Sequence, residues 1–100
     1  MINGIEVEIG GTVYTVPPLS LGAIERFESK LARPTSSDII DIALAALGRN
    51  YADLTRDKVA DMIDVENCGR VFEAIMGVSN LVPKVGESSV ATRKRRMIGG

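Results

Sequence analysis

The sequence has no histidine and no tryptophan, and its 100 residues include a single cysteine, Cys68. Without histidine, neither a Ser-His-Asp nor a Cys-His catalytic arrangement can form within one chain. A zinc site would lack its usual thiolate and imidazole ligands. One cysteine cannot form an internal disulfide, and it suits a reducing, intracellular setting. These absences predict a protein that is not an enzyme and that has no catalytic residue, metal site or cofactor.

Long apolar runs and aromatic side chains are also scarce. No run approaches the roughly 20 apolar residues that a membrane helix needs, and the N-terminus lacks a basic segment followed by an apolar one. Hydrophobic residues make up 45% and charged residues 25% of the chain, the balance of one ordinary globular domain. Only 4% of the residues are aromatic, so aliphatic side chains must fill the core. We therefore expect a cytoplasmic protein with no membrane partner.

Charge is unevenly distributed along the chain. Residues 1–79 hold seven Lys or Arg against twelve Asp or Glu, a net −5, whereas residues 80–100 hold five against one, a net +4. The basic residues of the tail cluster at Arg93, Lys94, Arg95 and Arg96. Such a cluster binds phosphates, but this one has no interleaved aromatics for base stacking and follows an acidic body, which disfavours nucleic acid as a partner. Solvation is the first interpretation; a clamp on the acidic body and a docking arm for an acidic partner are alternatives.

The stretch IEVEIGGTVYTVPP at residues 5–18 predicts a β-hairpin. Gly10-Gly11 suits the two central positions of a type I′ turn, which need positive φ. With that turn, residue 9 faces residue 12, and the register continues outward from there. One apolar face results, formed by Ile5, Val7, Ile9, Tyr14 and Val16 together with Thr12. Pro17-Pro18 then ends the second strand.

Two helices are predicted after the hairpin. Ser20 suits the N-cap of the first, which continues until Arg33-Pro34. The second begins at TSSD, residues 35–38, and ends at Gly48. Its apolar stripe makes it the most buried helix: Ile39, Ile40, Ala43, Leu44 and Leu47. We expect the apolar face of the hairpin to pack over these two helices, with both strand edges left unpaired.

Two shorter helices complete the body. Thr55 suits the start of the third, and Asp64 suits the cap of the fourth, which ends near Gly77. The residues that follow are polar and end in charge, as is typical of a flexible tail. The predicted fold class is α+β, mainly α, with an N-terminal hairpin packed on a bundle of about four short helices. Residues 1–79 form a single domain and residues 80–100 a flexible basic tail.

Three features that could carry chemistry have simpler interpretations. Asp57, Asp61 and Asp64 lack the glycine-pivoted spacing of a calcium loop, so a solvated helix face is favoured. The stretch EIGG leads into a second strand rather than a helix, which indicates a turn and not a phosphate-binding loop. Cys68 falls on the apolar stripe of a predicted helix, as a small core hydrophobe would.

Two stretches together have the pattern of a known family. The hairpin IEVEIGGTVYTVPPLSLG is followed by NYADLTRDKVADMIDVENCGRVFEAIMGVS, in which an acidic DLT helix start precedes a compact AIMGVS helix end. Over residues 5 to about 82, the chain resembles the tail assembly chaperones of long-tailed bacteriophages. The resemblance implies a protein that coats the tape-measure protein, a long helical and partly hydrophobic chain, and keeps it soluble until tube subunits polymerise around it.

The resemblance has further implications for partners and location. It implies that the protein stays in the host bacterial cytoplasm and is absent from the mature virion. Members of the family often have a second, longer form made by ribosomal frameshifting, whose extra domain recruits the tail tube protein. This chain would fit the short form.

A chaperone of this kind needs an adaptable apolar surface, and the third and fourth helices offer one. The candidate partner-binding residues form a stripe: Val59, Met62, Ile63, Phe72, Ile75 and Met76. Methionine adapts to irregular partners, although each residue taken alone is more simply a core residue. Many copies could also self-associate head to tail. Two other classes stay open: a small DNA-binding regulator, and a minor virion structural protein such as a connector or tube accessory protein.

Overall fold

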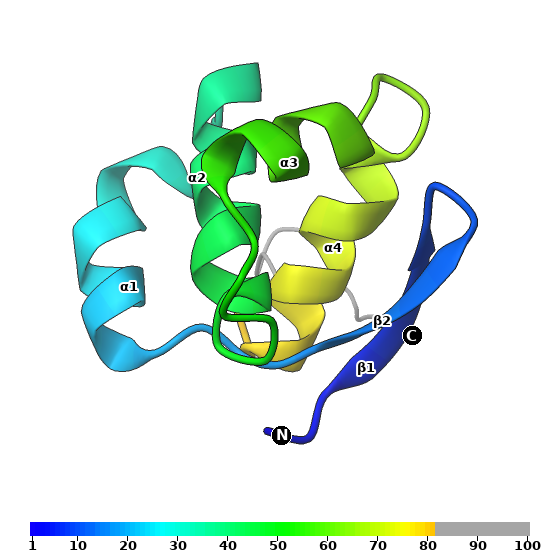
Figure 1. Ribbon diagram of the computed structural model, residues 1–100. Helices are drawn as coiled ribbons and strands as arrows, with labels where there is room; N and C mark the ends of the chain where they lie inside the picture. The colour runs from blue at the N-terminus through cyan, green and yellow to red at the C-terminus, as the bar shows by residue number, and fades with distance from the viewer. Residues whose placement is uncertain (82–100) are drawn as a thin grey trace, which may run out of the picture.

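The computed structural model describes residues 1–81 (Figure 1). An N-terminal two-stranded antiparallel hairpin is followed by four α-helices, and a short 3₁₀ helix extends the first of them. This arrangement confirms the predicted fold class, α+β and mainly α. The elements are, in chain order, β1 (Ile5–Ile9), β2 (Thr12–Val16), α1 (Leu21–Phe27), η1 (Glu28–Lys30), α2 (Ser36–Leu47), α3 (Arg56–Met62) and α4 (Cys68–Val78).

The hairpin has the register that the Gly10-Gly11 turn predicts. The pairs run from Ile9 opposite Thr12 to Ile5 opposite Val16. Both turn glycines have left-handed φ values, 61° and 87°, as the turn requires. Of the four branched aliphatic residues on the predicted apolar face, only Ile5, at the open end, is exposed, at 46%. The glycine turn and the hydrophobic pattern therefore specify the same register.

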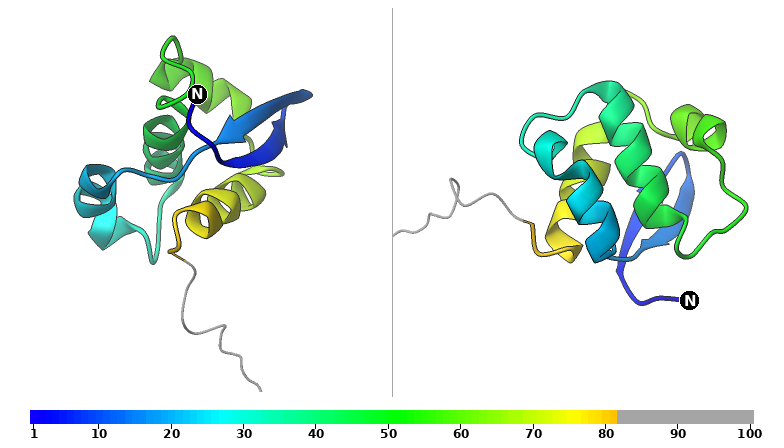
Figure 2. Two further views of the ribbon diagram at one scale, coloured as in Figure 1. Left: turned by 90° about the horizontal axis from the view of Figure 1, so that it is seen from below. Right: turned by 90° about the vertical axis from the view of Figure 1, so that its left-hand side faces the viewer.

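The hairpin lies on α2 and α4, and this corrects the expectation that the first helix lies beneath it. β1 packs on α4, β2 packs on both α2 and α4, and α1 contacts α2 on the side away from the hairpin (Figures 1 and 2). The fourth helix can take this place because Val71 and Ile75, one turn apart, are both fully buried. The shorter α1 buries only Ala23 and Phe27.

One hydrophobic core joins the hairpin to the helices. Its buried members are Val7, Ile9, Val16, Leu19, Ala23, Phe27, Ile42, Ala43, Ala46, Leu47, Val59, Val71, Ile75 and Met76. On α2 the buried face differs from the predicted stripe, because Ile42 is fully buried whereas Ile39 and Ile40 are half-buried. The sequence could not place this face, since Asp41 is the only polar residue between positions 39 and 47.

The predicted helix starts are confirmed by their capping hydrogen bonds. Ser20 Oγ accepts from the Ala23 N–H at 3.1 Å, and the Thr55 hydroxyl caps α3 in the same way. Thr35 forms a capping box, in which its hydroxyl accepts from the Asp38 N–H while the Asp38 carboxylate accepts from the Thr35 N–H. These local bonds fix where each helix enters the body.

The sequence predicts that the fourth helix ends near Gly77, whereas α4 ends one residue later. The helix continues to Val78, and Asn80 has the left-handed φ of 60° that closes it. The Leu81 N–H donates to the Met76 carbonyl at 2.8 Å, the long bond of a Schellman motif. The described body therefore extends two residues past the predicted boundary at residue 79. The predicted flexible tail beyond Leu81, with the basic cluster Arg93, Lys94, Arg95 and Arg96, lies outside the described residues.

Candidate functional site

The structure divides the predicted partner-binding stripe into two sets. Three of its residues belong to the core, with exposures of 0%, 0% and 5%: Val59, Ile75 and Met76. The other three are half-buried: Met62, Ile63 and Phe72. The Met62 sulfur accepts a long contact from Tyr14 Oη at 3.9 Å, so it lies toward the hairpin. Only Ile63 of the stripe lines a groove.

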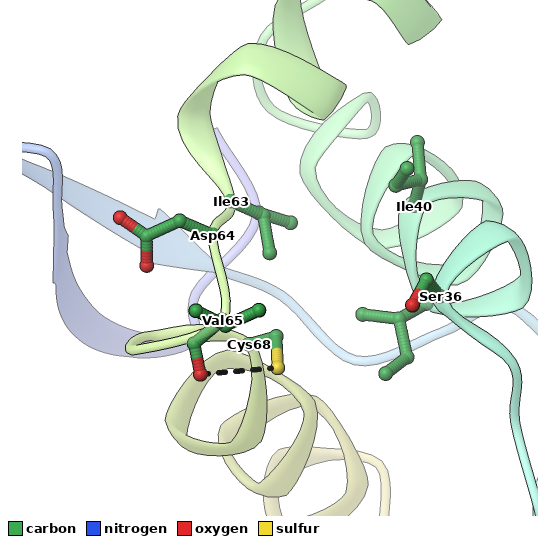
Figure 3. A pocket seen from close by; sticks show the side chains of 7 residues that line it. Ser36, Ile40, Ile63, Asp64, Val65 and Cys68 are labelled. Atoms are coloured by element: carbon green, nitrogen blue, oxygen red, sulfur yellow. Dashed lines mark hydrogen bonds between the residues drawn. The ribbon is translucent and has the colours of Figure 1, made fainter.

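That groove lies between the start of α2 and the connection from α3 to α4 (Figure 3). Its volume is about 210 Å³. The lining is mostly apolar and comprises Ser36, Ile39, Ile40, Ile63, Asp64, Val65 and Cys68, a set that we call the apolar groove. The Ile63 side chain points across it toward α2, whereas the Asp64 carboxylate points away (Figure 3). Val65, one of the lining residues, is 95% exposed, so part of the apolar lining lies open to water.

A hydrogen-bonded turn at residues 64–67 holds one wall of the apolar groove. Asp64 Oδ1 accepts from the N–H groups of Glu66 and Asn67, at 3.0 and 2.9 Å, and Asn67 Oδ1 accepts from the Asp64 N–H at 2.8 Å. Asn67 is only 7% exposed, and its Nδ2 donates to the Met62 carbonyl at 3.1 Å. Asp64 therefore caps the turn that leads into α4, whereas the N-cap of the helix itself is Asn67, three residues after the predicted cap. The turn fixes the position of Val65.

A polar hollow adjoins the apolar groove on the other side of this connection. It is lined by Glu8, Gly10, Asp64, Glu66, Asn67 and Arg70, which we call the acidic hollow. Arg70 Nη2 donates to the Glu8 carbonyl at 2.6 Å and lies 4.0 Å from the Glu8 carboxylate. Three carboxylates thus face one guanidinium, which leaves the hollow negatively charged. Asp64 lines both the groove and the hollow.

The sequence predicts that both strand edges are unpaired. In the structure, side chains that are distant in the sequence cover part of each edge. On β2, the Thr15 N–H donates to Tyr51 Oη at 2.8 Å, and the Thr15 carbonyl accepts from Asn50 Nδ2 at 3.2 Å. Asn50 also binds both backbone groups of Ile2, at 2.6 and 2.8 Å. On β1, Arg70 binds the Glu8 carbonyl. Because these contacts occupy backbone groups of Thr15 and Glu8, another chain cannot pair with the whole length of either strand edge.

The pKa of the Asp38 carboxyl lies below its ordinary value because the carboxylate accepts the Thr35 N–H and lies near Lys30. No group of three or more His, Cys, Asp or Glu residues that could hold a metal is found within residues 1–81. Over the same range, no helix is long and apolar enough to cross a membrane. Cys68 is half-buried, with Sγ 3.7 Å from the Val65 carbonyl.

The sequence pattern does not single out several residues of the apolar groove. It predicts Ile39 and Ile40 for the buried stripe, places Ser36 at a helix start and gives Val65 no role. One signal was available, because Val65 directly follows the capping Asp64 and precedes an acidic residue, which places an apolar side chain off the buried stripe. Comparison of the chain with protein-family models, with curated proteins and with solved structures found no match.

Proposed function

We propose that this protein is a non-catalytic binding module that receives an apolar helix of a partner in the apolar groove. The observation that carries the proposal is the juxtaposition of the groove with Val65, which is 95% exposed. An apolar side chain exposed beside an apolar hollow extends one apolar surface, and contiguous apolar surfaces are typical of interaction sites. The expected partner is the tape-measure protein, because the sequence resembles tail assembly chaperones and that partner is helical and partly hydrophobic.

The dimensions of the groove support a helical partner. A buried cavity of about 150 Å³ holds one benzene ring, so a groove of about 210 Å³ has room for one large side chain and part of a second. Residues at i and i+3 or i+4 of an amphipathic helix present such side chains on one face. The groove is lined from α2 on one side and from the α3–α4 connection on the other, which suits a helix laid along it.

The role is that of a chaperone that keeps the tape-measure protein soluble before the tail tube polymerises. It needs no catalysis, only contact repeated along a long partner. Self-association of many copies, a longer form that recruits the tail tube protein, residence in the host cytoplasm and absence from the mature virion are parts of the same proposal. No observation among the described residues favours the DNA-binding alternative, because Arg70, the one basic residue of α4, is bound to Glu8.

Co-expression tests the proposed function. The chain is produced together with the long helical protein encoded nearest to it, and the soluble fraction of that protein is compared with expression alone. We expect the partner to become soluble and to co-purify. The Val65→Ser variant tests the groove. Because the Val65 side chain is exposed, the variant should fold normally, but it should bring less of the partner into the soluble fraction. If both chains are soluble but never associate, the chaperone proposal is wrong, and recovery of the chain from purified particles would favour the virion-component alternative.

A further inference from the structure

The acidic hollow and the apolar groove form one composite surface. They lie on either side of the connection between α3 and α4, and Asp64 lines both. A single segment that fits this surface would carry several cations and, directly beside them, two or more apolar residues. The cations would meet Glu8, Asp64 and Glu66, and the apolar residues would meet Ile40, Ile63 and Val65.

The chain itself contains such a segment at residues 93–98, RKRRMI, outside the described residues. We propose that this segment of the same molecule covers the composite surface. Its four basic residues occupy the acidic hollow, and Met97 and Ile98 fill the apolar groove. The segment thereby competes with any partner for the groove, so that a partner helix has to displace it.

Charge complementarity favours this occupant. Within residues 1–81 the ion pairs are Lys30 with Asp38, Arg56 with Asp41, and Arg70 with Glu8. Neither Asp64 nor Glu66 forms an ion pair within residues 1–81, because Arg70, the cation that lines the same hollow, is bound to Glu8. Four adjacent basic residues would meet these carboxylates as a cluster, and clustered pairs contribute more than isolated surface pairs.

The length of the chain allows the same molecule to supply the segment. The described residues end at Leu81, after the end of α4, whereas the groove lies at Cys68, where α4 begins. The 11 residues of α4 rise about 16 Å along its axis. The sixteen residues from Leu81 to Met97 can span up to about 53 Å. An intramolecular segment acts at a millimolar effective concentration, which favours it over the segment of a second copy.

Labelling of Cys68 measures the occupancy of the groove directly. Cys68 is the only cysteine of the chain and lines the groove, so a neutral maleimide reports on this one position. If the segment occupies the groove nine-tenths of the time, the full chain is labelled about tenfold more slowly than a chain whose segment cannot bind. The measurement uses the chain alone, so its outcome is independent of whether the tape-measure protein is the partner.

Three full-length variants make the test specific. Replacing the four basic residues with Gln, or Met97 and Ile98 with Ser, should restore fast labelling, and 1 M salt should do so in the unchanged chain. The matched control, Val85→Ser with Val90→Ser, changes apolar residues outside the segment and should leave the protection intact. Because cations near a thiol speed its reaction, loss of charge alone would slow labelling, which is opposite to the expected effect.

Two results would overturn the inference. One is labelling of the unchanged chain at the same rate as both segment variants, within twofold, since the groove is then open. The other is protection that increases with protein concentration, since the segment then comes from a second copy.

Discussion

Removal of the hydroxyl group should reduce stability more at Tyr51, which contacts the hairpin, than at Tyr14, which belongs to β2. Tyr51 Oη accepts the Thr15 N–H at the edge of β2, at 2.8 Å. Among residues 1–81, Tyr14 Oη has only the Met62 sulfur as a partner, at 3.9 Å. The two rings pack edge to face, with centroids 5.2 Å apart, and phenylalanine preserves that packing at either position. Tyr51→Phe and Tyr14→Phe are therefore a matched pair that differs in one hydrogen bond.

The magnitude follows from the partner that each hydroxyl leaves behind. Tyr51→Phe leaves a half-buried backbone N–H without its acceptor, and such a loss costs about 1–2 kcal/mol. Tyr14→Phe loses a contact to a weak acceptor, so its effect should be about 0.5 kcal/mol or less. For a domain of this size, about 1 kcal/mol lowers Tm by roughly 4–8 °C.

Urea unfolding of the two variants and the unchanged chain, followed by circular dichroism, measures the difference. We expect the free energy of unfolding to fall clearly for Tyr51→Phe and hardly at all for Tyr14→Phe, with equal urea dependence. Equal losses in the two variants, or a larger loss for Tyr14→Phe, would refute the reasoning that Tyr51 caps the edge of β2.

Three further substitutions test other parts of the fold. A Cβ at Gly4 would clash with the Val16 carbonyl oxygen, so Gly4→Ala should displace the N-terminal segment and destabilise the fold by about 1–3 kcal/mol in urea unfolding. Asn50→Ala removes three hydrogen bonds and should cost about 2–3 kcal/mol in the same measurement. The pKa of Asp38 is lower in the folded protein than its ordinary value of 3.8, so the ionised carboxylate stabilises the fold at pH values above 3.8. This contribution is lost as the pH falls through the lower pKa of the folded state. The Asp38→Asn variant should therefore lack this part of the acid dependence of Tm.

Local chemistry explains why the hairpin and the helix starts could be predicted from sequence. Two adjacent glycines determine the turn, and the turn determines the register of every pair from Ile9–Thr12 outward. The caps at Ser20 and Thr35 depend on residues only three positions away. Such features need no knowledge of the tertiary fold, and the structure confirms them.

Contacts between distant residues explain what the sequence could not supply. Thr15 and Tyr51 are 36 residues apart, and Glu8 and Arg70 are 62 residues apart, so no local pattern links them. The same reason explains why the sequence predicted the first helix beneath the hairpin, whereas the structure has α4 there. The apolar groove needs both α2 and the α3–α4 connection, and only their packing shows that Ile40 lines a groove and is not buried in the core.

The proposal that the apolar groove binds an apolar helix of the tape-measure protein is tested most directly by the Kd of the purified chain for that protein. This Kd is compared among the unchanged chain, Val65→Ser and Leu21→Ser. Both residues are exposed, at 95% and 84%, but only Val65 lines the groove. Loss of a valine side chain that the bound partner would bury should weaken binding by about 1.5–3 kcal/mol, roughly 10- to 150-fold, whereas Leu21→Ser should leave Kd unchanged. Equal Kd values for all three chains, or a loss confined to Leu21→Ser, would contradict the account.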